Sequence, residues 1–294
     1  MEEDMIDLSN VTFIIPLRID TDDRLRNIIL STSFLLNNFD CKVIVKESDE
    51  MKKFELWALP TIKSIADTSN LIYQYEENHD DHFHRTRLLN EMVLDAETDI
   101  VVNYDSDIIL PISSYVTAKE MLDSHESDVV YPYRFGERGE RKVVLNTHIE
   151  DVDDLDALLK QPIVQEFVAT WKPEVLDQSY GYAPHGNGEG WAEYGMVQFF
   201  NKQVYMDGYL ENENFIAYAP EDVERHHRWS MFGYKIGRIN NYAYHMEHKR
   251  TPNSHYSNPF MTKNNQLWEY LKGLSHDELM DYYEALDYVK EKLK

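Results

Sequence analysis

The stretch TDIVVNYDSDIIL, residues 98–110, decides the fold class of this 294-residue chain. An apolar run stands directly before Asp105-Ser106-Asp107, and the apolar triplet IIL follows at once. A short apolar run of this kind is typical of a buried β-strand. Two acids at the end of a buried strand are costly unless they bind something, and a divalent cation bridging to a phosphate is an economical explanation.

The alternative interpretation of this motif is a strand-end turn with solvated acids. The Asp-x-Asp pattern is common in so acidic a chain, and it recurs at 20–22, 151–153 and 154–156. Only the copy at 105–107 directly follows an apolar strand, which favours a ligand-binding role for this copy.

The segments before this motif alternate between two kinds of pattern. Apolar runs predict strands at 11–16, 41–47, 70–76 and 98–104. The intervening segments predict helices at 22–38, 51–66 and 85–97. This β-α-β rhythm predicts an α/β fold with a parallel sheet and helices on both faces. In such sheets, ligands bind at the carboxyl ends of the strands.

The rest of the chain is less regular. A helix at 113–124 and a strand at 128–133 precede an insertion at about 134–190, whose last part, GYAPHGNGEG (181–190), we interpret as a mobile loop. Regular structure is expected again around 194–206, 222–232 and 234–245. The tail, 264–294, predicts two helices, with a capping box at 275–278. Its pattern does not decide whether they pack on the main domain or mediate dimerisation.

Composition narrows the classes of partner. The chain has 53 acidic and 29 basic side chains, a net charge of −24, which argues against general binding to nucleic acid or anionic lipid. A metal-lined cleft could still accept one anionic ligand. The single cysteine excludes an intramolecular disulfide and a Cys-rich zinc module. With no predicted signal peptide or membrane-spanning segment, we expect a soluble, cytoplasmic protein.

A histidine pair follows the strand-like run at 238–244. His245 and His248 are three residues apart, a spacing at which both can bind one metal ion. A site of Asp and His, completed by phosphate and water, suits Mn²⁺ at least as well as Mg²⁺. The alternative is a pair of surface histidines in a chain that has 12.

A third pattern, Pro220-Glu221-Asp222, follows the aromatic stretch FIAYA at 215–219. A carboxylate beside Tyr218 and apolar neighbours could have a pKa suited to a general base. The alternative is a helix start with acids in its first turn. Arg18 and Arg85 stand at predicted strand or helix ends, where they could pair with a diphosphate or with surface acids.

The order and spacing of these blocks resemble the GT-A fold glycosyltransferases, and more narrowly the β-1,4-galactosyltransferase family with its bacterial and viral relatives. The resemblance covers roughly residues 11–110 and 194–260. The matching blocks are FIIPLR (13–18), FHRTRLLNEMV (83–93), NYDSDIIL (103–110), YGMVQFFNKQVYMDGYLENENFIAYAPED (194–222), GYKIGRI (233–239) and HMEH (245–248).

The resemblance implies a Rossmann-like nucleotide-binding half with a mixed central sheet flanked by helices. One catalytic domain would span 1–263, with an acceptor half at about 191–263 and a C-terminal helical extension at 264–294. The residues that it implies for binding of the nucleotide sugar are Pro16, Arg18, Arg85, Asp105, Ser106, Glu193, Gly195 and Met196.

The resemblance also implies a metal site and a reaction. Asp107, His245 and His248 would bind Mn²⁺, with Mg²⁺ as the alternative. Glu221, Asp222 and Tyr218 would bind a glycan acceptor, and Asp222 would be the general base. The reaction would be inverting transfer from a UDP-sugar, with galactose or N-acetylgalactosamine as the expected sugar.

Three departures from the family pattern widen the range of substrates. Gly195-Met196 replaces a Gly-Gly pair, Glu193 stands at a position that helps choose the donor sugar, and Tyr218 replaces an acceptor-stacking Trp. The alternatives are therefore UDP-glucose or UDP-N-acetylglucosamine as donor, or a non-catalytic sugar-binding protein on the same fold. A nucleotidyltransferase is disfavoured because 17–26 contains no glycine. The absence of an anchor and of disulfides fits a bacterial or viral enzyme of polysaccharide biosynthesis.

Overall fold

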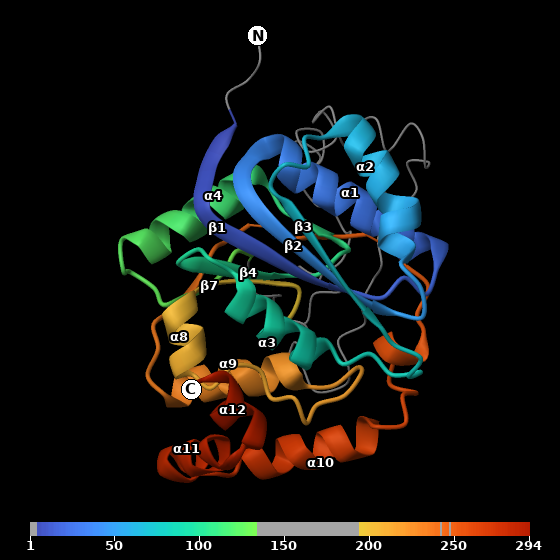
Figure 1. The fold of residues 1–294 in the computed structure, drawn as a ribbon. Coiled ribbons are helices and arrows are strands. Elements are labelled where there is room, and N and C mark those ends of the chain that lie inside the picture. The colour runs from blue at the N-terminus through green and yellow to red at the C-terminus, as the bar shows by residue number, and fades with distance from the viewer. Residues whose placement is uncertain (1–4, 134–193, 242, 247) are drawn as a thin grey trace.

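A computed structural model describes residues 5–133, 194–241, 243–246 and 248–294. The insertion predicted at about 134–190 and Glu193 therefore lie outside the described residues. Within the described part, the fold is built on one seven-stranded sheet (Figure 1). The strands lie in the order β3 (Leu71–Glu77), β2 (Phe39–Asp49), β1 (Ile6–Leu17), β4 (Ile100–Tyr104), β7 (Val197–Asn201), β6 (Val129–Tyr131) and β8 (Ile236–Arg238).

The sheet is mixed, as the family resemblance implies. Strands β3, β2, β1 and β4 are parallel to one another, as the β-α-β rhythm predicts. Strand β7 runs antiparallel to β4 and to β6, whereas β6 and β8 are parallel. The four strands predicted in the first third of the chain are confirmed.

Helices cover both faces of this sheet, with α1 and α2 on one side and α3 and α9 on the other (Figure 1). Helix α1 begins where predicted because the Thr21 side chain accepts a hydrogen bond from the Arg24 N–H at 3.3 Å. The segment predicted as one helix at 51–66 is a π-helical turn that continues into α2. The bounds are α1 (Asp22–Asn38), η1 (Phe54–Ala58), α2 (Leu59–Ile65), α3 (Arg85–Asp95), α4 (Ile112–Asp123), α8 (Lys202–Asp207) and α9 (Glu221–Met231).

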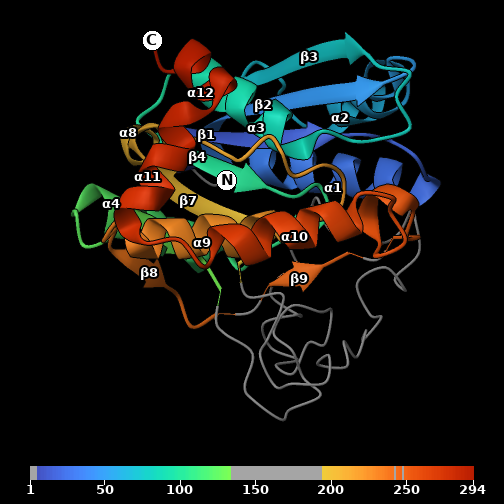
Figure 2. The ribbon, with the colours of Figure 1, turned by 90° about the horizontal axis from the view of Figure 1, so that it is seen from below.

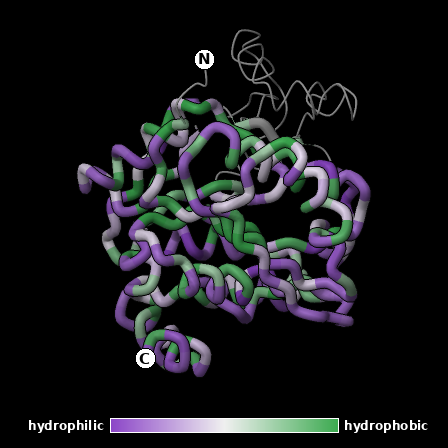
Figure 3. The backbone as a smooth tube through the Cα atoms, turned by 45° about the horizontal axis from the view of Figure 1, so that its top comes forward, coloured by the Kyte–Doolittle hydropathy of each residue, from purple (hydrophilic) through white to green (hydrophobic). Residues whose placement is uncertain are grey.

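The core beneath β1 and β4 is aromatic. Phe13 of β1 contacts Tyr104 and Phe199 edge to face, with ring centroids 5.5 Å and 5.9 Å apart. The Tyr104 hydroxyl donates to the carbonyl oxygen of Ile108 at 2.7 Å, across the turn that holds the acid pair. Figure 3 shows that the hydrophobic residues are concentrated in the interior of the molecule. The core therefore fixes the end of β4 and the turn that follows.

A second, two-stranded sheet connects two distant parts of the chain. Strand β5 (Ile108–Ile109) pairs antiparallel with β9 (Tyr244–His245), so that His245 lies opposite Ile108. The N–H of Met246 donates to the carbonyl oxygen of Asp107 at 2.7 Å. The histidine block is thereby held beside the acid turn.

The tail forms three helices, so the prediction of two was wrong. Helices α10 (Met261–Leu271), α11 (His276–Ala285) and α12 (Asp287–Lys292) follow one another, and α11 begins with the predicted capping box of Ser275 and Glu278. The break comes at Leu286, which is extended at φ −70° and ψ 129°. No Gly or Pro stands there, so the local sequence gave no signal for it.

The tail helices pack on the segment that precedes and includes α9 (Figure 2). Phe215 forms a small apolar cluster with Leu271, Leu279 and Tyr283, separate from the main core. The Tyr283 hydroxyl also donates to Glu224 Oε1 of α9 at 2.6 Å. Of the two roles left open for the tail, packing on the rest of the chain is thus observed, while the domain boundary at 263 stays a prediction.

A buried ion pair joins α9 to the sheet. Arg225 Nη1 lies 2.6 Å from Glu211 Oε1, and both side chains are fully buried. Arg225 Nη2 donates to Gln198 Oε1 of β7 at 3.0 Å, and Asn103 Nδ2 of β4 donates to Glu211 Oε1 at 3.3 Å. Burial alone would raise the pKa of Glu211, but Arg225, the Tyr205 hydroxyl and further arginines together outweigh burial, and the pKa is lowered. The Glu211 carboxylate therefore stays charged inside the protein.

We expect Arg225→Met to lower the free energy of unfolding by about 3–5 kcal/mol, because it leaves the Glu211 charge buried without its partner. Urea denaturation followed by circular dichroism measures this difference. The matched control is Lys42→Met, which removes an ion pair with Glu97 at 3.0 Å on the surface. A loss at Arg225 no larger than the loss at Lys42 would contradict the structural role assigned to the buried pair.

Candidate active site

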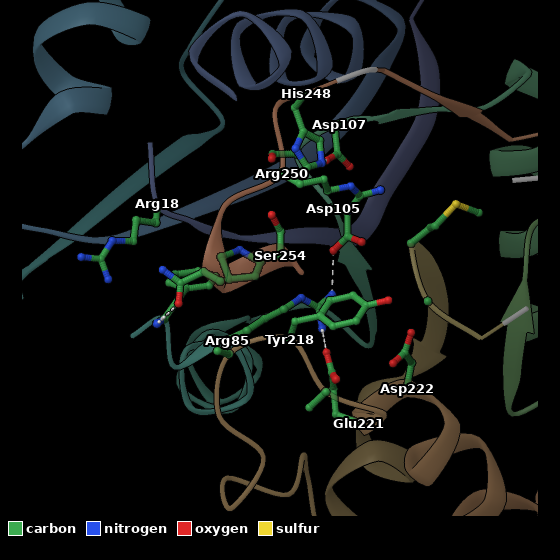
Figure 4. Close-up of a pocket in the computed structure, with 18 of the residues that line it drawn as sticks. Arg18, Arg85, Asp105, Asp107, Tyr218, Glu221, Asp222, His248, Arg250 and Ser254 are labelled. Atoms are coloured by element: carbon green, nitrogen blue, oxygen red, sulfur yellow. Dashed lines mark hydrogen bonds and ion pairs between the residues drawn. The ribbon is translucent and has the colours of Figure 1, made fainter. Parts of the chain in front are cut away.

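One cavity of about 270 Å³ opens at the carboxyl ends of β1 and β4 (Figure 4). Its walls come from the end of β1, the turn after β4, the start of α3, the start of α9 and the segment after β9. All of the predicted site residues except Glu193 and His245 line it. These are Pro16, Arg18, Arg85, Asp105, Ser106, Asp107, Gly195, Met196, Tyr218, Glu221, Asp222 and His248.

The acid turn is held by backbone contacts on several sides. The Asp105 N–H donates to the carbonyl oxygen of Met196 at 2.9 Å, and the Ser31 hydroxyl of α1 donates to the carbonyl oxygen of Ser106 at 2.9 Å. The side chains of Asp105 and Asp107 lie at the cavity (Figure 4). Asp107 is 5% exposed, so this turn is not the solvated one of the alternative interpretation.

Asp107 and His248 form the pair best suited to a metal ion. His248 Nε2 lies 3.1 Å from Asp107 Oδ2, and both residues are buried. His248 Nδ1 lies 3.0 Å from the carbonyl oxygen of Lys249, and Nε2 faces Asp107. An imidazole nitrogen and a carboxylate oxygen are both ligands that divalent transition-metal ions accept. The two side chains therefore fit a metal ion.

The remaining ligands of such a metal have to be sought elsewhere. His245 is in β9 by its backbone, but its side chain lies outside the described part of the structure, so its predicted role as a ligand stays a prediction. In the described residues, no cluster of three or more His, Cys, Asp or Glu could hold a metal by itself. Phosphate oxygens and water would have to complete the site. Arg24, which the sequence analysis missed, has Nη1 4.0 Å from Asp107 Oδ2 and offers a positive charge beside it.

Arg85 connects the acid turn to the start of α9. As the first residue of α3, it places Nη2 2.7 Å from Asp105 Oδ1 and Nη1 3.6 Å from Glu221 Oε1 (Figure 4). Glu221 and Asp222 occupy the first turn of α9, as expected from the alternative interpretation of a helix start with acids in its first turn. They also line the cavity, so the two interpretations hold together.

The two adjacent carboxyls at the start of α9 both have raised pKa values. Burial raises the pKa of Glu221 well above its ordinary value, and the neighbouring Asp222 adds to the effect. Burial likewise raises the pKa of Asp222, although Arg225 and Arg85 oppose the shift. A carboxyl with a raised pKa in a cleft is suited to accept a proton in catalysis.

At the other end of the cavity, aromatic and amide side chains form the wall. The ring of Tyr218 meets that of Tyr256 edge to face, with centroids 5.1 Å apart. Asn258 Nδ2 donates to the carbonyl oxygen of Tyr218 at 2.7 Å and fixes its backbone. The lining residues that the sequence analysis did not find include Asp20, Arg24, Phe83, Arg250, Asn253, Ser254, Tyr256, Met261 and Asn265. Three of these had a usable signal: Arg250 is a basic residue just after the histidine block, Asp20 belongs to the Asp-x-Asp copy at 20–22, and Phe83 opens the block at 83–93.

Arg18 lies apart from the acid cluster, at the far side of the cavity in Figure 4. Its Nη1 atom is buried and has no hydrogen-bond partner within the described residues. A buried donor of this kind gains stability when a ligand supplies an acceptor. The position therefore fits the nucleotide contact predicted for Arg18.

Comparisons with known proteins rest on structure alone. No protein-family model matches the chain, and no curated protein matches its sequence. The mannosyltransferase PcManGT from Pyrobaculum calidifontis, in complex with GDP-Man and Mn²⁺, matches with a TM-score of 0.52 and 12% identity over 97% of this chain and 72% of that one. S. aureus TarS 1–349 in complex with UDP-GlcNAc matches with a TM-score of 0.50 and 14% identity over 82% and 59%.

These likenesses establish a GT-A fold for the described part of the chain. The catalytic domain of Drosophila β1,4-galactosyltransferase 7 matches over 83% of this chain and 72% of that one, but with 12% identity and a TM-score of only 0.43, which carries no argument for the narrower family. The chain spans 60% of TarS 1–349 and 36% of a longer TarS chain. No helix within the described ranges has the length and apolar character needed to cross a membrane.

The raised pKa of Glu221 predicts a pH effect on stability. The folded protein holds this proton to a higher pH than the unfolded chain, so its contribution is present below the ordinary pKa of 4.5 and is lost as pH rises through the raised value. We expect the unfolding free energy of the wild type, relative to Glu221→Gln, to fall between pH 4.5 and pH 8. Urea titrations across this range measure it.

Glu126→Gln, at an exposed position, serves as the control for this pH effect. The difference in unfolding free energy between Glu126→Gln and the wild type should stay nearly constant over the same pH range. A difference for Glu221→Gln that is also flat, or that rises with pH, would contradict a raised pKa at this carboxyl.

Proposed function

We propose that this protein is a metal-dependent, inverting glycosyltransferase that moves a sugar from a UDP-sugar to a glycan hydroxyl. The observation that carries the proposal is the convergence of Asp107, His248, Arg85 and Asp222 on one cavity of a GT-A fold, although they come from segments far apart in the chain. The sugar nucleotides and the metal named for the matching TarS and mannosyltransferase structures support it.

The donor would bind between β1 and the acid turn. Arg18 would supply its buried donor to the nucleotide, and Asp105, held by Arg85 at 2.7 Å, would accept from the ribose or face the metal. Ser106, Pro16, Gly195 and Met196 would line the donor's path. Arg24 and Arg250 would add positive charge near the diphosphate.

Asp107 and His248 would hold the metal ion, with Mn²⁺ preferred over Mg²⁺ because one ligand is an imidazole. When bound, the ion would neutralise charge on the departing diphosphate. The third proposed ligand is His245. This arrangement also reconciles an acidic protein with a dianionic donor, since the metal and the arginines reverse the local charge.

Asp222 would act as general base. It would take the proton from the acceptor hydroxyl as that oxygen attacks the anomeric carbon, while the bond to the diphosphate breaks and UDP leaves. Attack from the face opposite the leaving group inverts the anomeric configuration. Glu221 would bind the acceptor sugar, and Tyr218 would stack against it.

The donor sugar is proposed to be galactose or N-acetylgalactosamine, as in the family that the sequence resembles. The TarS complex with UDP-GlcNAc favours N-acetylglucosamine as a second candidate, with glucose beside it. Glu193, proposed to help choose the sugar, lies outside the described residues. A role in bacterial or viral polysaccharide biosynthesis in the cytoplasm completes the proposal.

Slow hydrolysis of the donor tests this function without knowledge of the acceptor. The protein is incubated with UDP-galactose, UDP-N-acetylgalactosamine, UDP-glucose and UDP-N-acetylglucosamine, each with Mn²⁺, with Mg²⁺ or with EDTA, and release of UDP is followed. Metal-dependent release from one donor supports the proposal and identifies the sugar. No release from any donor, together with no binding of UDP, would refute it.

We expect Asp107→Ala and His248→Ala each to abolish Mn²⁺-dependent binding of UDP, because each removes one of the proposed metal ligands. Isothermal titration calorimetry with UDP, with and without Mn²⁺, measures this. His255→Ala, which changes an exposed histidine, is the matched control. Unchanged Mn²⁺-dependent affinity in both site variants would show that the metal lies elsewhere.

We expect Asp222→Asn to lower turnover by about 10²–10⁴-fold while UDP affinity stays within twofold, because only the proton acceptor is lost. In the wild type, kcat/KM should fall as the pH drops through the pKa of Asp222, because the base is then protonated. Burial raises this pKa, so the fall should come above the ordinary aspartate range. Asp281→Asn on α11 is the exposed control. Full turnover in Asp222→Asn would instead favour a non-catalytic sugar-binding protein or another base.

A further inference from the structure

Gly195 and Asp222 lie against each other across the cavity wall. A Cβ atom built on Gly195 would lie 2.5 Å from Asp222 Oδ2 and 3.6 Å from its Cγ. Nonbonded carbon and oxygen atoms do not approach to 2.5 Å without repulsion. The Asp222 carboxylate therefore occupies space that any other residue at position 195 would fill with its side chain.

The glycine is not needed for its backbone freedom. Gly195 does not have the positive φ that favours glycine. The next residue, Met196, does have one, at φ 64°. Within this dipeptide, Met196 has the left-handed backbone conformation, whereas Gly195 has a neighbouring side chain where its own Cβ would lie. Glycine is therefore required at position 195 because it has no side chain, which leaves room for Asp222.

Three hydrogen bonds hold the Gly195 peptide in place. Its carbonyl oxygen accepts hydrogen bonds from the Tyr133 hydroxyl at 2.6 Å, from the Val197 N–H at 2.9 Å and from Gln198 Nε2. Gln198 in turn accepts from Arg225, one turn along α9 from Asp222. The same hydrogen bonds therefore hold the backbone at Gly195 and the helix that carries Asp222. A side chain at position 195 would displace the Asp222 carboxylate rather than either backbone.

We propose that Gly195 is a positioning residue, whose missing side chain lets the Asp222 carboxylate take its place at the acceptor end of the cavity. The proposal rests on the proposed function, in which Asp222 is the general base. It changes the role expected for Gly195, from contact with the nucleotide sugar to placement of the base. A methyl group at 195 would push the carboxylate away while leaving the fold and the donor contacts in place.

The test uses Gly195→Ala, Asp222→Asn and the double variant in the full chain, with UDP release and UDP binding measured for each. We expect Gly195→Ala to lower turnover by about 10–100-fold, because a displacement of about 1 Å at a reacting group has this effect. UDP affinity should stay within twofold. The double variant should be no slower than Asp222→Asn alone, because both changes act through the same carboxylate.

Two further readouts separate a positioning role from a merely structural one. The acid limb of the pH profile should shift in Gly195→Ala, because the carboxylate leaves its present surroundings. Any loss of stability in urea should be recovered by adding Asp222→Ala, which removes the group that opposes the methyl. Gly273→Ala is the control for adding a methyl, since a Cβ there meets nothing nearer than 3.5 Å.

Several outcomes would overturn the proposal. Full turnover in Gly195→Ala would show that the carboxylate needs no such space. Losses that multiply in the double variant, or a loss of UDP affinity, would show that Gly195 acts on the donor. If Asp222→Asn itself keeps full turnover, the assignment of the base fails first, and this result is distinct from all the others.

Discussion

The buried ion pair between Glu211 and Arg225 is the constraint on which the site depends. Two full charges at 2.6 Å with no exposure are tolerable only when every neighbour is in place, since removing one partner leaves a charge in a medium of low polarity. Those neighbours are Asn103 of β4 and Gln198 of β7. The pair therefore fixes α9 relative to the two strands that carry the rest of the site.

Three parts of the cavity lie two or three residues from members of this hydrogen-bonded group. Asn103 is followed by the acid turn, Gln198 is preceded by Gly195, and Arg225 lies one turn after Asp222 on α9. A shift of α9 would change the separation between the metal-binding end and the base together. The geometry of a reaction that needs both ends is thus tied to the stability of the core.

The cavity has a more even balance of charge than the molecule as a whole. The net charge of −24 repels an anionic ligand at long range, but among the described residues four arginines line the cavity beside five acids. The arginines are Arg18, Arg24, Arg85 and Arg250. At the start of α9, the helix dipole and the arginines favour charged carboxylates, whereas burial favours protonated ones. Burial prevails at both Glu221 and Asp222, which leaves them able to exchange protons.

Pairing between distant segments completes the metal-binding end. Strands β5 and β9 are only two residues each, yet they bring the block after residue 244 to the turn after β4. This pairing brings His248 to within 3.1 Å of Asp107, although the two residues are far apart in the sequence. The tail helices pack instead against α9, which carries Glu221 and Asp222.

The sequence by itself predicted the elements whose signals are local. The strands and helices of the first third follow from hydrophobic periodicity, and the start of α11 follows from its capping box. The acid turn, the histidine block and the start of α9 could be identified as candidates because residue type and order carry that information. The third tail helix was missed because its break at Leu286 has no local mark.

Only the tertiary structure decided which side chains share the cavity. Arg24 and Tyr256 carry no motif, and they line the site because chain segments far apart in sequence pack beside one another. The contact of Gly195 with Asp222 likewise depends on a distance through space between the segment before β7 and the start of α9. Periodicity reports the environment of each segment, whereas a site is made by long-range packing, which no single stretch of sequence encodes.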